Sequence, residues 1–212
     1  MQPAKDRLLT IEDVHGNTEP LIGFKNLKSV RKFNGERSIS FTVVPTKENV
    51  HTVPLVQEES KVQFDDEVYV IKQVIERKVG NRYVKQCEAI HSFFVDFMGA
   101  YEYKAYSGKF ELWQILNILF EGTGHKYRGE SLHDPEGGGK VLYESKELKD
   151  FGNDNKLSLF YKALELWGAY FEYVRDFLGY KGMLVTGNPG KDRGFQLRYN
   201  YNIKAIVFFA SK

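Results

Sequence analysis

The chain has 212 residues, enough for one large domain or two small ones, either of which could bury a real core. Its formal net charge is +2 and its acidic and basic residues are interspersed, so neither a nucleic-acid-binding patch nor a membrane-attracting field is evident. The single cysteine, Cys87, excludes an intramolecular disulfide framework, and its place in a predicted strand indicates an apolar packing role.

Strand signals dominate the first ninety residues. Lys25 to Phe33 leads into Asn34-Gly35, the pair typical of a type I′ hairpin turn, because both of its central residues need positive φ. In the strand that follows, the apolar residues Ile39, Phe41 and Val43 share one face. Several short strands with turns between them predict a small antiparallel barrel or sandwich.

The stretch from Phe64 to Phe94 predicts two long strands joined at Gly80-Asn81, the first preceded by a tight turn at Asp65-Asp66. Apolar residues occupy both the even and the odd positions of the first strand, which indicates that both of its faces are covered. One cover must be the domain's own core; the other is a second layer, a neighbouring subunit or a partner. The candidate interface residues are one of two sets: Val68, Val70 and Val74, or Tyr69, Ile71 and Ile75.

Beyond Phe94, an aromatic and turn-rich segment leads into two amphipathic helices. The first is predicted from about Phe110 to Glu121, with Gly122 as its C′ residue and an apolar stripe of Leu112, Ile115, Leu116 and Leu119. The second is predicted from about Lys156 to Trp167, with Asn153 or Asn155 as its cap and Gly168 at its end.

A short aromatic strand is expected after each helix, at Lys126–Arg128 and at Ala169–Arg175, so that helix, glycine and strand recur as a crude internal repeat. Residues from about 95 to 185 therefore predict a separate small α+β domain. The loop Gly187–Gly194 ends it, and Phe195–Tyr199 resumes a strand.

Three short motifs could hold a ligand, but each favours an ordinary structural role. The GGGK sequence at Gly137–Lys140 lacks the leading glycine and the following Ser or Thr of a phosphate loop, so a mobile loop is expected. His133-Asp134 has no second cluster at metal-ligand spacing. Cys87 and His91 lie about 13 Å apart on a strand, too far for a nucleophile and its base. The remaining histidines, like His91, are expected at the surface or in turns: His15, His51 and His125.

The sequence therefore predicts no catalytic residue, no metal site and no cofactor. It opens MQPAKDRLLT, without the apolar region of a signal peptide, and no apolar run is long enough to span a bilayer. We expect synthesis as a soluble cytosolic product without a membrane segment.

The order of the segments carries a family resemblance. The segments are HGNTEPL, the hairpin leading to SISFTV, ENV, the stretch from FDDEVYV to FFVDFM, LFEGTGHKY, LELWGAYFEY and QLRYNYNIKAI. In this order they resemble the N-terminal region of siphophage tail-tip proteins, the prophage tail endopeptidase or tail-associated lysin family. That family is similar in structure to the central baseplate hub of contractile phage tails.

The resemblance implies an α+β, mainly β fold. In the family the hub is a homotrimer, and each chain contributes two related tube domains with an α+β domain inserted between them. Residues 1–92 would be the first, barrel-like tube domain, residues 93–188 the α+β domain with two helices, and residues 189–212 a strand leading towards a second tube domain. This sequence departs from the pattern at Lys212, about where that second tube domain should begin.

The function implied is that of a structural component of a phage or prophage tail tip or baseplate hub. It would close the tail tube in the virion and form part of the channel for genome ejection, after synthesis in the bacterial host cytoplasm. The expected partners are further copies of the chain, the distal tail protein and the tape-measure protein, with DNA only as passing cargo. The family's endopeptidase or lysin activity lies in C-terminal regions of longer members, so no enzyme is expected here.

The alternative is a binding module for cell-wall carbohydrate. Such a module would use an aromatic groove drawn from Tyr101, Tyr103, Tyr106 and Trp113.

Overall fold

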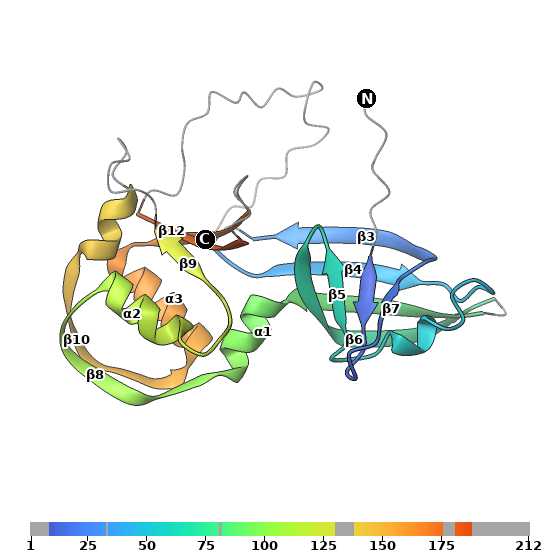
Figure 1. Ribbon diagram of the computed structural model, residues 1–212, viewed down its shortest axis with the longest axis horizontal. Coiled ribbons are helices and arrows are strands. Elements are labelled where there is room, and N and C mark those ends of the chain that lie inside the picture. Colours follow the sequence, from blue (N-terminus) through green and yellow to red (C-terminus); the bar gives the residue numbers. More distant parts are fainter. Residues whose placement is uncertain (1–8, 33, 81, 130–137, 176–180, 188–212) are drawn as a thin grey trace, which may run out of the picture.

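A curled sheet and an α+β part lie side by side in the computed structural model, with helix α1 (Ser92–Gly99) between them (Figure 1). The structure describes residues 9–32, 34–80, 82–129, 138–175 and 181–187. The expected strand at Phe195–Tyr199, the lead-in over residues 189–212 and the His133-Asp134 pair lie outside these residues.

Seven antiparallel strands form the curled sheet, in the order β2-β1-β5-β6-β7-β4-β3. Their bounds are β1 Thr10–Glu12, β2 Thr18–Pro20, β3 Phe24–Arg31, β4 Arg37–Val43, β5 Lys61–Phe64, β6 Glu67–Val79 and β7 Arg82–His91. A short 3₁₀ helix, η1 (Val53–Leu55), lies between β4 and β5. The predicted α+β, mainly β class is confirmed. The sheet is not a closed barrel, because β2 and β3 remain its two edges in the described part of the chain.

The turns within the sheet follow local backbone chemistry. Asp65 and Asp66 have φ values of +51° and +61° and connect Phe64 to its partner Glu67, which confirms the predicted tight turn. The β6–β7 connection also takes the predicted two residues, since Val79 pairs with Arg82. The β3–β4 turn differs from the expected type I′ geometry. Lys32 donates its backbone N–H to the Glu36 carbonyl, which leaves three residues in the loop instead of two.

The core of the sheet lies against one of its two faces. Strand β4 alternates as predicted, with Ile39, Phe41 and Val43 fully buried. Each such side chain contributes roughly 1.5–3 kcal/mol by leaving water. The same core includes Cys87, which packs as an apolar residue as expected.

The α+β part contains both predicted helices, α2 (Leu112–Phe120) and α3 (Lys156–Trp167). The whole predicted stripe of α2 is buried, and Gly168 adopts the left-handed conformation that ends α3. Asn155 is the cap of α3, because its side chain accepts the Ser158 N–H at 2.9 Å. Short strands follow the helices near the expected positions: β9 Tyr127–Gly129 and β11 Tyr170–Arg175.

Two long strands of this part were not predicted, nor was α1. β8 (Tyr101–Glu111) and β10 (Ser145–Asn155) pair as an antiparallel ribbon that curves around α2 and α3 (Figure 1). The internal repeat is therefore strand, helix and strand: β8-α2-β9 and β10-α3-β11. Strand β12 (Lys181–Thr186) joins the two copies, since it pairs antiparallel with β11 and parallel with β9. The 3₁₀ helix η2 (Gly138–Tyr143) occupies the described part of the GGGK loop.

Candidate functional site

A β-bulge in β6 determines which of its apolar residues face the core. Ile71 pairs with Ala89 and Gln73 pairs with Glu88, so Lys72 is an extra residue on β6. Before the bulge the odd residues Tyr69 and Ile71 enter the core, and beyond it the even residue Val74 packs against that core. The odd apolar residues of β6 thus face the core before Lys72, and the even ones face it after Lys72.

The opposite face of β6 is covered at Val70 and more open on either side of it. Val70 is buried, and its cross-strand neighbour Ile90 packs against the core of the α+β part. Helix α1 contacts both β6 and β7. Val68 and Ile75, in contrast, are each 36% exposed. Of the six candidate interface residues, these two have the most accessible side chains.

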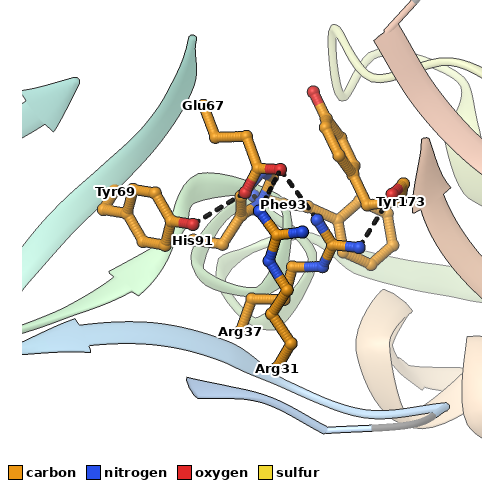
Figure 2. A network of polar contacts seen from close by, with 7 residues as sticks. All are labelled: Arg31, Arg37, Glu67, Tyr69, His91, Phe93 and Tyr173. Carbon is orange, nitrogen blue, oxygen red and sulfur yellow. Dashed lines mark hydrogen bonds and ion pairs between the residues drawn. The ribbon is translucent and has the colours of Figure 1, made fainter. Parts of the chain in front are cut away.

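A polar network connects the sheet to the α+β part (Figure 2). Arg37 on β4 donates to the Glu67 carboxylate and to the Tyr173 carbonyl of β11, each at 2.7 Å. Glu67 also accepts the Tyr69 hydroxyl at 2.7 Å. Both partners of the Arg37–Glu67 pair are about nine-tenths buried, and each has a further hydrogen bond, which a buried pair needs to offset its desolvation. A second link comes from Asn34, whose side chain accepts the Phe171 N–H at 2.9 Å.

His91 lies inside this junction and not at the surface, so the surface position expected from the sequence is wrong. Its ring packs edge-on against Tyr69 and Tyr173, with centroids 5.4 Å and 4.5 Å away (Figure 2). Nδ1 accepts the Phe93 N–H at 3.2 Å and so caps α1. The Nε2 atom is buried and has no hydrogen-bond partner among the residues that the structure describes. Burial, and then the neighbouring charge of Arg37, lower the pKa of His91 from 6.5 to about 3, so the ring is neutral.

The one cysteine of the chain is held in its thiol form. Burial raises the pKa of the Cys87 thiol to about 12, so the nucleophilic thiolate is disfavoured. Within the described residues, no group of three or more His, Cys, Asp or Glu side chains could hold a metal ion. The described helices also include none that is long and apolar enough to cross a membrane.

The two edges of the sheet differ in charge. From Phe24 to Lys32, the β3 edge carries four basic residues and no acidic one: Lys25, Lys28, Arg31 and Lys32. From Ile11 to Pro20, the β1–β2 edge carries three acidic residues and no lysine or arginine: Glu12, Asp13 and Glu19. Edge strands present unpaired backbone groups, so both edges can accept a further strand.

The four aromatic residues considered for carbohydrate binding do not form one groove. Tyr101 and Tyr103 stand together at the start of β8, with ring centroids 4.6 Å apart and Tyr103 82% exposed. Tyr106 packs edge-on against Phe110. Trp113 belongs to α2, packs against the core and donates its indole N–H to Glu111 at 2.6 Å.

The sequence indicated the apolar strand β6 but not the network around it. Arg37 and Glu67 are 30 positions apart, and nothing in either local pattern pairs them. The one local signal is that Glu67 begins a strand of apolar residues in which a buried carboxylate would require a partner.

The match to a known family covers the curled sheet. Residues 9–91 match the family model of the prophage endopeptidase tail N-terminal domain. A comparison with curated proteins finds no match.

Several solved structures share the fold over most of the chain. Prophage tail protein gp18 from Listeria monocytogenes EGD-e matches 93% of this chain with a TM-score of 0.72 and 22% identity. The 43 kDa tail protein of prophage MuSo2 from Shewanella oneidensis matches 86% with a TM-score of 0.51 and 11% identity. A chain of the Francisella PdpA–VgrG complex matches 87% with a TM-score of 0.54 and 11% identity.

These relatives are longer than the present chain. The match covers 56% of the Listeria chain, 56% of the Shewanella chain and 29% of the Francisella chain. The present chain thus spans about half the length of the two prophage tail proteins. Residues 9–91 thus match the prophage endopeptidase tail N-terminal domain, and the chain shares its fold with a prophage tail protein.

Proposed function

We propose that the chain is a structural subunit of a phage or prophage tail tip or baseplate hub. Its curled sheet would pair edge to edge with neighbouring tube domains in the virion and so build part of a ring around an axial channel. The ring would close the tail tube and let the tape-measure protein and DNA pass during ejection. The observation that carries this proposal is the open seven-stranded sheet with two oppositely charged edges.

Opposite charge on the two edges suits a head-to-tail contact. In such a contact the β3 edge of one tube domain meets the β1–β2 edge of the next, and a repeated rotation closes a ring. Lys25 and Lys28 are exposed on β3, and Glu19 is exposed on β2. The charge difference would select the partner edge and disfavour contact between two β3 edges.

The exposed residues of β6 would form a separate apolar contact on the outer face of the sheet, because β6 is a central strand and lies at neither edge. Val68 and Ile75 lie outside the core of the sheet and are each 36% exposed. We assign the subunit or domain contact to these two, while Tyr69, Val70, Ile71 and Val74 are buried or packed within the chain.

Charge reversal on the full-length protein tests the proposal. The double variant K25E/K28E should lose self-association, seen as a fall in mass by native mass spectrometry. The matched control K109E/K149E changes two exposed lysines of the β8–β10 ribbon and should leave the mass unchanged. Adding E12K/E19K to the first variant should restore association, because the charges of both edges are then exchanged. Normal assembly of K25E/K28E would rule out the β3 edge as the contact.

The exposed tyrosine pair supports a second candidate function, binding of cell-wall carbohydrate. Two rings 4.6 Å apart, one of them 82% exposed, offer an apolar surface on which a sugar ring could stack. Titration of cell-wall fragments should then give saturable binding that Y103S abolishes and Y143S, at another exposed tyrosine, does not. Absence of saturable binding would exclude this candidate.

A further inference from the structure

The β6–β7 hairpin extends beyond the rest of the sheet. Strand β5 pairs with β6 only as far as Val70, and β4 pairs with β7 only as far as Lys85. Between Arg77 and Tyr83, each strand of the hairpin therefore pairs only with the other. This segment, the hairpin arm, points away from the α+β part (Figure 1).

The hairpin arm combines positive charge with exposed apolar surface. Arg77, Lys78 and Arg82 are exposed, and the arm has no acidic residue. None of these three cations has an ion-pair partner among the described residues. Val79 and Tyr83 are 61% and 62% exposed. Since Lys78 pairs with Tyr83, and Val79 with Arg82, each face of the arm presents one cation beside one apolar side chain.

A two-stranded ribbon of this kind is only marginally stable alone in water, because neither face buries apolar surface. A partner that covers Val79 and Tyr83 would remove this apolar area from water, and acidic groups beside it would pair with the three cations. We propose that the hairpin arm docks onto an acidic, partly apolar surface of another protein.

Two other occupants fit the observations less well. On a second copy of this chain, the acidic β1–β2 edge is the surface that the proposed ring assigns to the β3 edge of a neighbour, so it is not open to the arm. Nucleic acid would use the cations but would leave the aliphatic Val79 without a matching surface.

A groove continues the docking surface from the arm onto the sheet. It has a volume of about 490 Å³ and lies across β3, β4, β7 and β6. Ile75 and Arg77 line the groove at the root of the arm, and its remaining lining is mostly polar, with Ser40, Thr42 and Gln86. A partner that holds the arm can therefore extend along the sheet as far as Arg77 and Gln86 in this groove.

The inference goes beyond the proposed function. Ring closure uses the edges β3 and β2, whereas the arm lies at the end of the central strands. The variants that test the two are different, so docking of the arm can fail while the edges still associate, and the reverse also holds.

Binding of a labelled acidic peptide tests the proposal. The probe is a short fluorescein-labelled peptide of alternating Glu and Leu, titrated with the full chain and followed by fluorescence anisotropy. Saturable binding is expected, weakened at least about tenfold by R77E/K78E/R82E and to a similar degree by V79S/Y83S. The control K104E/K109E, on exposed lysines of β8, should bind like the parent chain. Circular dichroism should show that all variants remain folded.

Any of three results would overturn the proposal. The first is absence of saturable binding by the parent chain. The second is equal affinity for a peptide of alternating Gln and Leu, which would show that the acidic groups are not recognised. The third is tighter binding of a short DNA duplex than of the acidic peptide, with no effect of V79S/Y83S, which would identify the arm as a nucleic-acid contact.

Discussion

The ammonium group of Lys156 donates a hydrogen bond to the backbone carbonyl of Glu121 at 2.7 Å, so the first residue of α3 caps the end of α2. Lys156 is buried, and a cation at a helix N-terminus is unfavourable for its own helix. The orphan carbonyls at the C-terminus of α2 compensate, because they carry partial negative charge. Lys146 acts in the same way on α3, where it donates to Leu166 at 2.6 Å.

Replacing the Lys156 ammonium should therefore destabilise the α+β part. We expect K156M to lower the free energy of unfolding by about 1–3 kcal/mol, since the Glu121 carbonyl then loses its partner. The control K162M, at an exposed position of the same helix, should change the free energy of unfolding by less than about 0.5 kcal/mol. Urea denaturation gives both values. Equal effects of the two variants would show that water replaces the ammonium without cost.

The buried pair of Arg37 and Glu67 should be strongly coupled. Among the described residues, Glu67 without Arg37 keeps only the exposed Arg31 at 3.7 Å and the Tyr69 hydroxyl. Without the Glu67 charge the buried Arg37 has no anion there, so R37M and E67Q should each cost about 3 kcal/mol. A double-mutant cycle with R37M/E67Q should give a coupling energy of at least about 1 kcal/mol. For comparison, K72M should cost less than about 1 kcal/mol, because Lys72 pairs with the exposed Glu59. Additive effects of R37M and E67Q would contradict the direct interaction.

The helices that the sequence predicted well are those whose signals are all local. Helix α3 begins and ends at the predicted residues because an apolar stripe, a capping Asn155 and the left-handed Gly168 agree. Helix α1 has only eight residues, and its cap is His91, a residue type that gives no cap signal from sequence.

Strands without alternating hydrophobicity were not predicted, for a physical reason. The β8–β10 ribbon packs one face on the helices and leaves much of the other in water, and its register shifts at two bulges. Asp150 and Asn153, both at positive φ, lie in the irregular part of β10 and read locally as turn residues. The bulge at Lys72 could not be predicted for another reason. Apolar residues occur at both odd and even positions of β6, so the sequence does not show where the core-facing positions change from odd to even.

Acidification should weaken the junction through His91. Its pKa is lowered from 6.5 to about 3 on folding, so the unfolded chain binds more protons between these values. The stability that this group contributes is complete above pH 6.5 and is lost as the pH falls towards 3, at up to about 1.4 kcal/mol per pH unit.

Asn is the matched substitution for this test, because it keeps an acceptor at the cap of α1 and does not titrate. The difference in unfolding free energy between the parent chain and H91N, measured by urea denaturation at several pH values, should shift in favour of H91N below pH 6.5. This difference removes the contribution of the carboxylates, which titrate in both proteins. A difference that stays constant with pH would mean that the ring remains accessible to protons in the folded chain.

Alanine substitutions at two glycines of the β8–β10 ribbon should distinguish the cost of a steric clash from the cost of backbone strain. Gly152 and Gly108 have φ values of +136° and +118°, which any other residue adopts only with strain. A Cβ at Gly152 would also clash with the backbone carbonyl of Lys104 on the paired strand, whereas a Cβ at Gly108 would meet open space. G108A should therefore lower the free energy of unfolding by about 1–3 kcal/mol from strain alone, and G152A by clearly more, since the two strands must also move apart.

Urea denaturation of the two variants measures the difference, and amide hydrogen exchange should show faster exchange along β8 and β10 in G152A only. Equal stability of G108A and G152A would show that the ribbon opens at the bulge without cost, and that its curvature around α2 and α3 does not depend on the close approach at Gly152.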